Sequence, residues 1–300
     1  MKWLKWIGIV LGVLVVVLCA AIGTVFAVSQ RRFDRRWDVA GHALTINHDS
    51  ATVARGRHLV QAVVKCVDCH GPDLAGTRFI DDPALGLVVA SNLTSGQGGV
   101  GKMYDDVAFE RALRHGVRRD GAGLRVMPSF EMQNMADDDV AAIIAYLRAV
   151  PPVDKILPAT SLRLLARVLY VAGELPIIDA ERIDQAARPP ASMPFAPTRE
   201  YGAYFARING CLGCHGEGLS GGKIPGTPPD WPPAANITPT GLAQYQEADF
   251  MKLLRTGVRP SGVKVSDVMP WRLAKDLTDD EIHVLWLYLQ GVPKREFGGH

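Results

Sequence analysis

The chain opens on a long apolar stretch, in which residues 6–28 carry no charge. A helix of that length rises about 34 Å, slightly more than the hydrocarbon core of a bilayer. The small-x-small site Ala21-Ile22-Gly23 is a poor signal-peptidase site, and the apolar run continues beyond it. We therefore expect an uncleaved membrane anchor rather than a cleaved signal peptide. Cys19, inside the run, is interpreted as a small packing residue.

Beyond the anchor, apolar residues recur at helical spacing. Asp105 or Asp106 can cap a helix that closes at Gly116, and residues 249–257 repeat this pattern. A last helix is expected from Asp137 to the prolines at 151–152, and its counterpart opens with a capping box at residues 278–281. Residues 161–173 indicate a further helix, interpreted as a packed bridge, with a second membrane contact as the alternative. Because no strand-like alternation of useful length appears, we predict an all-α fold.

The same landmarks occur twice in the same order. They are Cys66-Val67-Asp68-Cys69-His70 and Cys211-Leu212-Gly213-Cys214-His215, Asn92-Leu93-Thr94 and Asn236-Ile237-Thr238, Arg114 to Arg118 and Arg255 to Arg259, Met127-Pro128 and Met269-Pro270, Tyr146 and Tyr288, and Pro151 and Pro293. This internal repeat predicts two equivalent units in tandem.

The repeat sets the expected domain boundaries. We predict an anchor and juxtamembrane segment at 1–45, a first domain at 46–152, a proline-rich linker with a short helix at 153–198, and a second domain at 199–300. Gly56 and Gly202 lie at similar distances before the first cysteine of each unit. We hypothesise that each allows a close crossing with the last helix of its unit, near Tyr146 or Tyr288.

The amino-acid composition and charge limit the classes of function that this chain can have. The 300 residues are 48% hydrophobic and 21% charged, with a formal charge of +2. That content is typical of a globular protein, and the balanced charge argues against nucleic acid as a partner. Four of the five cysteines lie in the two Cys-x-x-Cys-His motifs, so cysteine chemistry is expected to carry the function.

Each Cys-x-x-Cys-His motif is typical of covalent haem attachment. Two thiols on one helical turn can bond to one edge of a haem, and the following histidine then faces the iron. We therefore predict two covalently bound haem c groups, attached at Cys66 and Cys69 and at Cys211 and Cys214, with His70 and His215 as iron ligands. A four-cysteine zinc site and two short-range disulfides are the alternatives, but neither explains the paired histidines.

The second axial ligands are expected to be Met127 and Met269, which recur at matching places. A thioether is soft and neutral, favours ferrous iron and suits outer-sphere electron transfer. The following proline can hold each methionine in a non-helical loop. The remaining methionines are interpreted as core residues.

Other repeated polar residues are candidates for contacts with the haem propionates. They are Asn92, Asn236, Arg114, Arg118, Arg255 and Arg259. Solvated arginines at helix ends are an equally good interpretation of the four cations. Histidines without a partner in the repeat are interpreted as surface or packing residues; they are His42, His48, His58, His115, His283 and His300.

Taken together, these residues resemble the class I cytochrome c family, and in particular the cytochrome subunits of bacterial membrane-bound alcohol, aldehyde and sugar-acid dehydrogenases. The resemblance covers about 50–150 and 200–295. It implies two tandem cytochrome c domains after a transmembrane helix in the bacterial inner membrane, with the haem domains in the periplasm.

The implied role is carriage of single electrons. The expected partners are a dehydrogenase or quinol-oxidising protein on one side and a downstream cytochrome or terminal oxidase on the other, and no independent catalysis is expected. Two alternatives remain at this point: a di-haem cytochrome c peroxidase, which needs an iron that can release its distal ligand, and a docking subunit of an oxidase complex.

Overall fold

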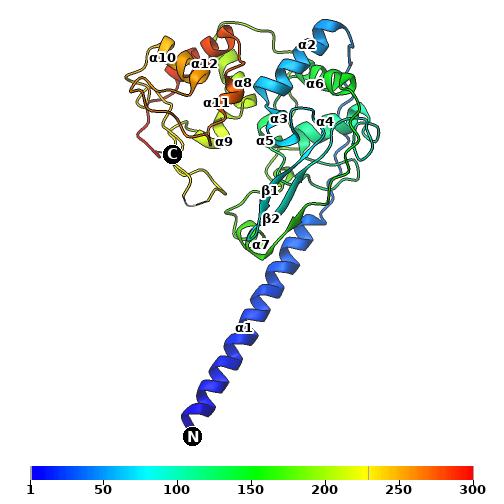
Figure 1. Cartoon of the computed structure of the whole chain (residues 1–300), viewed down its shortest axis with the longest axis vertical. Coiled ribbons are helices and arrows are strands. Elements are labelled where there is room, and N and C mark those ends of the chain that lie inside the picture. Colours follow the sequence, from blue (N-terminus) through cyan, green and yellow to red (C-terminus); the bar gives the residue numbers. More distant parts are fainter. Residues whose placement is uncertain (1, 229, 300) are drawn as a thin grey trace.

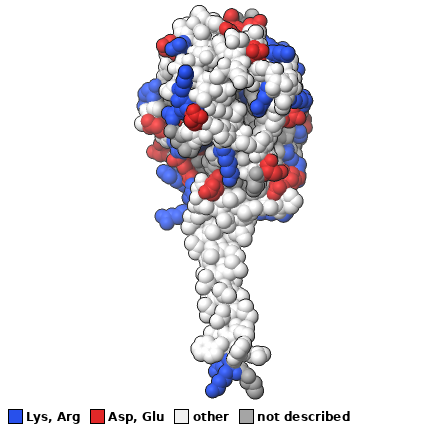
Figure 2. All heavy atoms as spheres, turned by 90° about the vertical axis from the view of Figure 1, so that its left-hand side faces the viewer, with Lys and Arg blue, Asp and Glu red and all other residues white. Residues whose placement is uncertain are grey.

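A single long helix projects from a body made of two helical units (Figure 1). The computed structural model describes residues 2–228 and 230–299. The projecting helix, α1, runs over Lys2–Phe33, and its most apolar window has a mean hydropathy of 2.9 with none of it buried in the protein. In the space-filling view the shaft is free of charged residues between its base and the body (Figure 2). By length and composition α1 can cross a membrane.

The two units contain the same kinds of helix in the same order. The first holds α2 (Ser50–His58), a π-helical turn η1 (Leu59–Val63), α3 (Cys66–His70), α4 (Asp106–His115), α5 (Ser129–Met132) and α6 (Asp137–Ala149). The second holds α8 (Arg199–Ile208), α9 (Cys211–His215), α10 (Glu247–Thr256), α11 (Trp271–Ala274) and α12 (Asp279–Gly291). Between them lie α7 (Leu164–Val171) and a 3-10 turn, η2 (Asp179–Glu181). The repeat in the sequence is therefore also a repeat of backbone structure.

Local capping explains where these helices begin and end. Asp105 accepts a hydrogen bond from the Ala108 N–H at 2.8 Å, and Gly116 ends α4 with a left-handed φ of 64°. The capping box at Thr278 is present at the start of α12. The helix expected from Asp249 begins two residues earlier, because the Asp249 carboxylate accepts a hydrogen bond from the backbone N–H of Gln246 and so lies inside the first turn.

The all-α prediction needs correction in the first unit. Overall 44% of the residues are helical and 7% lie in strands. Strands β1 (Thr77–Asp82) and β2 (Gly86–Ala90) form an antiparallel hairpin, and β3 (Ser161–Leu162) pairs with β2. A register shift between Arg78 and Ile80 interrupts the alternation of inward and outward side chains, which removes the sequence signal for a strand. Asp82 orders the turn by accepting hydrogen bonds from two backbone N–H groups at 2.7 Å each.

The same sheet shortens the helix expected at 161–173. Ser161 pairs with Leu87 and Leu162 with Gly86 as β3, so α7 starts only at Leu164. Figure 1 shows α7 at the base of the first unit, beside the point where α1 enters it.

Both predicted glycine crossings are confirmed. A Cβ built on Gly56 would lie 1.9 Å from the carbonyl oxygen of Ala142 in α6. A Cβ on Gly202 would lie 2.1 Å from the carbonyl oxygen of Val284 in α12. Each glycine also faces the Cβ of the tyrosine expected there, Tyr146 or Tyr288. In both units the first and last helices thus cross at a distance that a side chain would prevent.

The units are joined by a shared core and by a buried polar cluster. One contiguous group of buried apolar residues includes Leu59 and Ile143 from the first unit and Phe205 and Leu285 from the second. Beside it, the Tyr204 hydroxyl donates to the Asp139 carboxylate at 2.7 Å. Because side chains of both units meet in both clusters, the units hold a fixed arrangement.

The same polar cluster reaches the outer helices of both units. Arg55 on α2 donates to Asp139 at 2.9 and 3.0 Å, and Nε2 of His58 lies 2.8 Å from Glu281 on α12. Asp139 and Glu281 are each only 4% exposed. His58, expected at the surface or in packing, therefore contributes to the junction between the units.

The crossings generate a stability prediction. Gly56→Ala or Gly202→Ala must push two helices apart, so we expect each to lower the free energy of unfolding by about 2–3 kcal/mol. Gly12→Ala is the control, because nothing lies within 4 Å of a Cβ at that position in α1. Thermal unfolding followed by circular dichroism measures the effect. Unchanged unfolding temperatures for Gly56→Ala and Gly202→Ala would contradict the close crossing.

Candidate haem-binding sites

The two Cys-x-x-Cys-His motifs form short helices with matching backbone geometry. The residue before each motif has a left-handed φ, 57° at Lys65 and 75° at Gly210. The residue after each is a glycine with φ and ψ of 81° and 160° at Gly71, and 78° and 162° at Gly216. Only glycine adopts that last conformation readily, so each motif is confined to a single turn.

The histidines of both motifs make the same hydrogen bond. Nδ1 of His70 lies 2.7 Å from the carbonyl oxygen of Ser91, and Nδ1 of His215 lies 2.7 Å from that of Ala235. A carbonyl can only accept, so Nδ1 carries the proton and Nε2 keeps a free lone pair. Burial lowers the pKa of both rings, which keeps them neutral at physiological pH. Each ring is thus oriented and protonated as a metal-ligating imidazole requires.

The four motif cysteines are free thiols that stay protonated at neutral pH. Burial raises the pKa of Cys66 and Cys69 to about 12 and that of Cys211 to about 11, and it also raises that of Cys214. All five cysteines of the chain are free thiols, so the disulfide alternative finds no support. Over residues 2–228 and 230–299, no group of three or more His, Cys, Asp or Glu side chains is placed to hold a metal ion, so the four-cysteine zinc alternative finds none either. The donor set of each motif fits covalent haem.

The Met-Pro segments adopt one loop geometry in both units. The N–H after each proline donates to the methionine carbonyl at 2.8 Å, from Ser129 to Met127 and from Trp271 to Met269. With φ and ψ of −78° and 53° at Pro128, and −78° and 45° at Pro270, each segment is close to an inverse γ-turn. Both methionines are partly buried against the core cluster that Cys66 and Cys211 also contact.

The two asparagines have a structural role instead of the expected propionate contact. Asn92 donates from Nδ2 to the Val153 carbonyl at 2.8 Å and accepts from the N–H and hydroxyl of Thr94. Asn236 does the same with the Arg295 carbonyl, at 2.7 Å, and Thr238. Both amides are occupied by backbone, because they tie the loop after the histidine to the segment that follows the last helix.

The four arginines divide into two pairs. Arg114 donates to the Met135 carbonyl and to Asp137 at 2.7 Å, and Arg255 donates to the Leu277 carbonyl and to Asp279 at 2.6 Å. These two cations brace the start of the last helix of each unit, a role that neither expected interpretation included. The side chains of Arg118 and Arg259 lie at the surface, in agreement with the solvated interpretation.

A partly buried lysine connects the segments that lead into the two motif helices, and the repeat gave no signal for it. The ammonium of Lys65 donates to the carbonyl of Asn209 at 2.7 Å, to Oδ1 of Asn209 at 2.9 Å and to the Val63 carbonyl at 2.8 Å. Burial lowers the pKa of Lys65 to about 8, while the nearby cysteine thiols, Cys211 first, act in the opposite direction. Lys65 immediately precedes one motif and Asn209 lies two residues before the other, so this side chain bridges the segments that lead into α3 and α9.

A carboxylate of the first unit reaches the motif of the second. A Cβ built on Gly213 would lie only 2.9 Å from Oε1 of Glu131 on α5. Glycine at position 213 therefore leaves space for the Glu131 carboxylate. Oε2 of Glu131 is buried without a hydrogen-bond partner in the described part of the chain. Burial raises the pKa of Glu131 to about 7. The sequence around Glu131 does not predict this contact, because the contact depends on how the two units pack against each other.

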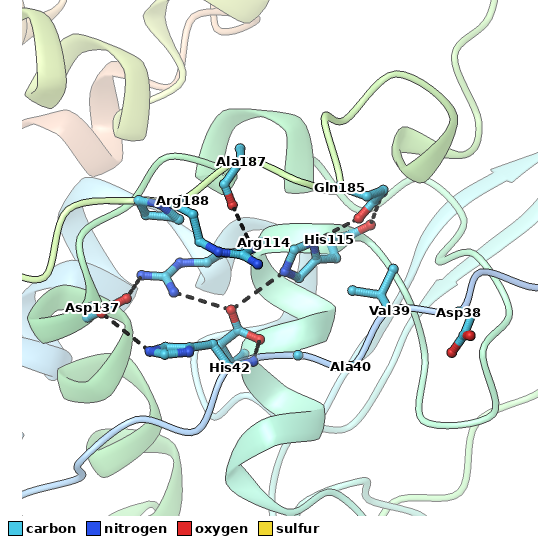
Figure 3. A pocket seen from close by; sticks show the side chains of 13 residues that line it. Asp38, Val39, Ala40, His42, Arg114, His115, Asp137, Gln185, Ala187 and Arg188 are labelled. Atoms are coloured by element: carbon cyan, nitrogen blue, oxygen red, sulfur yellow. Dashed lines mark hydrogen bonds and ion pairs between the residues drawn. The ribbon is translucent and has the colours of Figure 1, made fainter.

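A cavity of about 300 Å³ lies away from both motifs, between α4, the segment that follows α1, and the linker (Figure 3). Its wall is made of groups that pair with each other. Glu110 accepts from Arg114 at 3.2 Å and from the His42 N–H at 2.9 Å, and Nδ1 of His115 lies 2.7 Å from Oε1 of Gln185. These pairs hold the N-terminal segment and the linker against the first unit.

Comparison with known proteins places the first unit in a family. Residues 51–147 match the family described as cytochrome c oxidase, cbb3-type, subunit III. These residues extend from α2 to α6 and include the first Cys-x-x-Cys-His motif and Met127. The chain contains a cytochrome c domain. Together with relatives that are cytochrome c subunits of dehydrogenases, this match supports an electron-transfer role and covalently bound haem c.

Longer matches extend over most of this cytochrome. It is 28% identical over 283 residues to the cytochrome c subunit of a quinone alcohol dehydrogenase from Gluconacetobacter polyoxogenes, which covers 85% of this chain and 59% of that protein. It is 27% identical to the corresponding subunit from Gluconobacter oxydans, over 84% of this chain and 57% of the relative. A fructose dehydrogenase cytochrome subunit from Gluconobacter japonicus is 38% identical over 37% of this chain and 24% of its own length. The cytochrome thus spans less than two thirds of the length of these relatives.

The buried glutamate generates a pH prediction. Because the pKa of Glu131 is raised from 4.5 to about 7, the folded state binds its proton more tightly than the unfolded state. Protonation of Glu131 therefore favours the folded state. This contribution to the free energy of unfolding is fully present below pH 4.5 and is lost as the pH rises through 7. We expect Glu131→Gln to raise the free energy of unfolding at pH 8 by up to about 3 kcal/mol and to leave it unchanged at pH 4.

Denaturant unfolding at a series of pH values measures this effect. Glu217→Gln is the matched control, because the Glu217 side chain is 64% exposed and pairs only with Arg207. A pH dependence between 4.5 and 7 that is the same in Glu131→Gln and in the unsubstituted protein would refute the buried, protonated state.

Proposed function

We propose that this protein is a membrane-anchored di-haem c-type cytochrome that passes single electrons from a dehydrogenase or quinol-oxidising partner to a downstream cytochrome or terminal oxidase. The observation that carries the proposal is the hydrogen bond of His70 and His215, which leaves Nε2 of each ring free in a motif that also holds two partly buried thiols. The first motif lies in the matched cytochrome domain, and the second shares its backbone geometry.

In this proposal each unit holds one haem by four residues. Cys66 and Cys69 would bind it covalently in the first unit, and His70 and Met127 would supply the two protein ligands of its iron. The second unit uses the corresponding set, namely Cys211, Cys214, His215 and Met269. Bound haem c supplies a reversible one-electron couple between ferric and ferrous iron. The protein contributes a neutral imidazole oriented by a backbone carbonyl, a soft thioether that favours the reduced state, and a buried setting that excludes water.

The arrangement of the motifs supports transfer between the two units. The Lys65 ammonium bridges the segments that lead into α3 and α9, because it donates to the Asn209 carbonyl at 2.7 Å. A buried positive charge favours the state that carries one more electron. Lys65 therefore raises the reduction potential at both motifs and holds the two attachment helices together.

The relatives suggest the class of electron donor. Those reported above are cytochrome subunits of alcohol and fructose dehydrogenases. We propose that this chain likewise accepts electrons from a membrane-bound dehydrogenase.

We propose that α1 spans the bacterial inner membrane with the two units in the periplasm. The arginines that follow the span, at residues 31, 32, 35 and 36, would favour the cytoplasmic side if they acted only as topology signals. In the structure Arg32 is used for packing, because it donates to Glu181 and to the Tyr170 carbonyl. Haem attachment outside the cytoplasm, which the family resemblance implies, supports the periplasmic orientation.

Haem content is the first test of the function. We expect two covalently bound haems per chain by pyridine haemochrome assay and intact mass. Cys66→Ser and Cys211→Ser should each weaken one attachment and leave the other intact. A ratio of one haem per chain, carried by the first unit alone, would remove the second unit from the proposed electron path.

Axial ligation is the second test. If Met127 and Met269 both ligate, both irons are low-spin, and hydrogen peroxide turns over slowly or not at all. Met127→His should keep a low-spin centre with a lower reduction potential, because imidazole donates more strongly than thioether, and Met269→His should change only the other potential. Spectroscopic redox titration measures both. A high-spin, peroxide-reactive centre in the half-reduced protein would contradict the carrier and favour a peroxidase.

A further inference from the structure

Helix α7 lies at the level where the charge-free part of α1 ends. The Arg167 guanidinium on α7 lies 4.8 Å from the ring centre of Phe26 and donates to the hydroxyl of Ser29 at 2.9 Å. One turn further along, the Tyr170 ring stacks on Phe33 at 5.1 Å with an interplanar angle of 3°. The charge-free run ends at residue 28. α7 therefore lies beside the boundary between hydrocarbon and headgroups if α1 spans a membrane.

Contacts around Arg32 make this junction rigid. Arg32 donates to the Tyr170 carbonyl at 3.0 Å and to Glu181 at 2.9 Å, and the Tyr170 hydroxyl donates to the same carboxylate at 2.9 Å. Phe33 and Tyr170 are 4% and 1% exposed, in a buried cluster that continues into the first unit. Because α1 continues into packed structure, the span and the first unit move as one body.

The outer face of α7 is apolar and uncovered. Leu164, Leu165 and Val168 are 36%, 45% and 39% exposed, whereas Ala166 and Tyr170 on the opposite face are buried. On α1, Phe26 and Val28 are 43% and 39% exposed at the same level. The apolar surface of α7 is thus continuous with that of the spanning helix.

The charges at this level suit a phospholipid surface. Residues 31–36 contain four arginines and one aspartate, and Arg163 is exposed at the start of α7. Cations directly outside an apolar surface match the phosphates of anionic lipids, and an amphipathic helix with this pattern is typical of a membrane interface.

We propose that α7 lies in the membrane–water interface, with Leu164, Leu165 and Val168 at the boundary of the acyl chains. The haem-bearing units are then held in one orientation to the bilayer instead of turning freely on a tether. This inference depends on the proposed anchoring by α1 and is independent of haem number and axial ligation.

The experiment measures the depth of a nitroxide label on the full-length holoprotein, in nanodiscs of phosphatidylethanolamine and phosphatidylglycerol. Cys19→Ser removes the exposed thiol, and single cysteines are introduced by Leu165→Cys, Val16→Cys and Val263→Cys. Val16 lies in the span and is 67% exposed, and Val263 lies in the second unit and is 59% exposed. Collisions with oxygen and with a water-soluble nickel complex are compared by power saturation in reduced protein, because low-spin ferrous iron is diamagnetic.

We expect the ratio of oxygen to nickel collisions at residue 165 to lie between the values at 16 and 263, and several-fold above that at 263. A lipid-like label at 16 with a water-like label at 165 would overturn the α7 proposal and leave the anchor standing. Water-like labels at both positions would overturn both. A label at 165 that is shielded from both reagents would mean that a protein covers the face, which also overturns the proposal.

A second variant separates lipid contact from packing. Val168→Glu places a charge on the exposed face, and Val263→Glu is the matched control at an exposed valine of the second unit. We expect Val168→Glu to shift the label at 165 toward water, with unchanged haem spectra and unfolding temperature, and Val263→Glu to have no effect. An unchanged label depth in Val168→Glu would contradict contact between this face and lipid.

Discussion

Each half of this cytochrome depends on a crossing of two helices at a distance that only glycine permits. At Gly56 and at Gly202 the first helix of a unit lies directly on the backbone of the last helix. This contact fixes where the first helix ends, and the Cys-x-x-Cys-His turn begins only a few residues later. The same crossing brings the C-terminal segment near the loop after the histidine, where Asn92 or Asn236 ties the two together. The geometry of each candidate site therefore follows from one backbone contact.

Packing between the units brings charged groups of the first unit close to the second motif. Lys65 binds Asn209 across the boundary, and Glu131 reaches the turn at Gly213. One is a cation and the other a carboxyl group with a raised pKa, so the first unit sets part of the electrostatic environment of the second motif. The Asp139 and Glu281 clusters and the shared apolar core keep these groups in place. The second motif thus lies in an environment that its own half of the chain does not specify.

Packing contacts also fix how α1 is joined to the first unit. Arg32, Phe33 and Tyr170 convert a tether into a rigid support, with a polar and stacked contact at its base. In the role that we propose, electron exchange with partners at a membrane, a fixed height and orientation would determine which surface a partner can approach. The end of α1 and the linker build this support together, and both lie outside the two repeats.

The sequence alone determined the features that depend on residues close together in the chain. The motif turns, the helix caps at Asp105 and Thr278 and the Met-Pro loops follow from local chemistry, and the repeat exposed even the glycine crossings because both copies keep the same spacing. Only the tertiary structure decided the roles of Arg114, Arg255 and the asparagines, each of which binds a group 20 or more residues away. It also decided the roles of Lys65 and Glu131, which contact Asn209 and Gly213 of the other unit. The hairpin was also hidden, because its bulge removes the period of two that identifies a strand. A side chain that can pair in several ways takes the partner that packing brings near, and packing is a property of the whole chain.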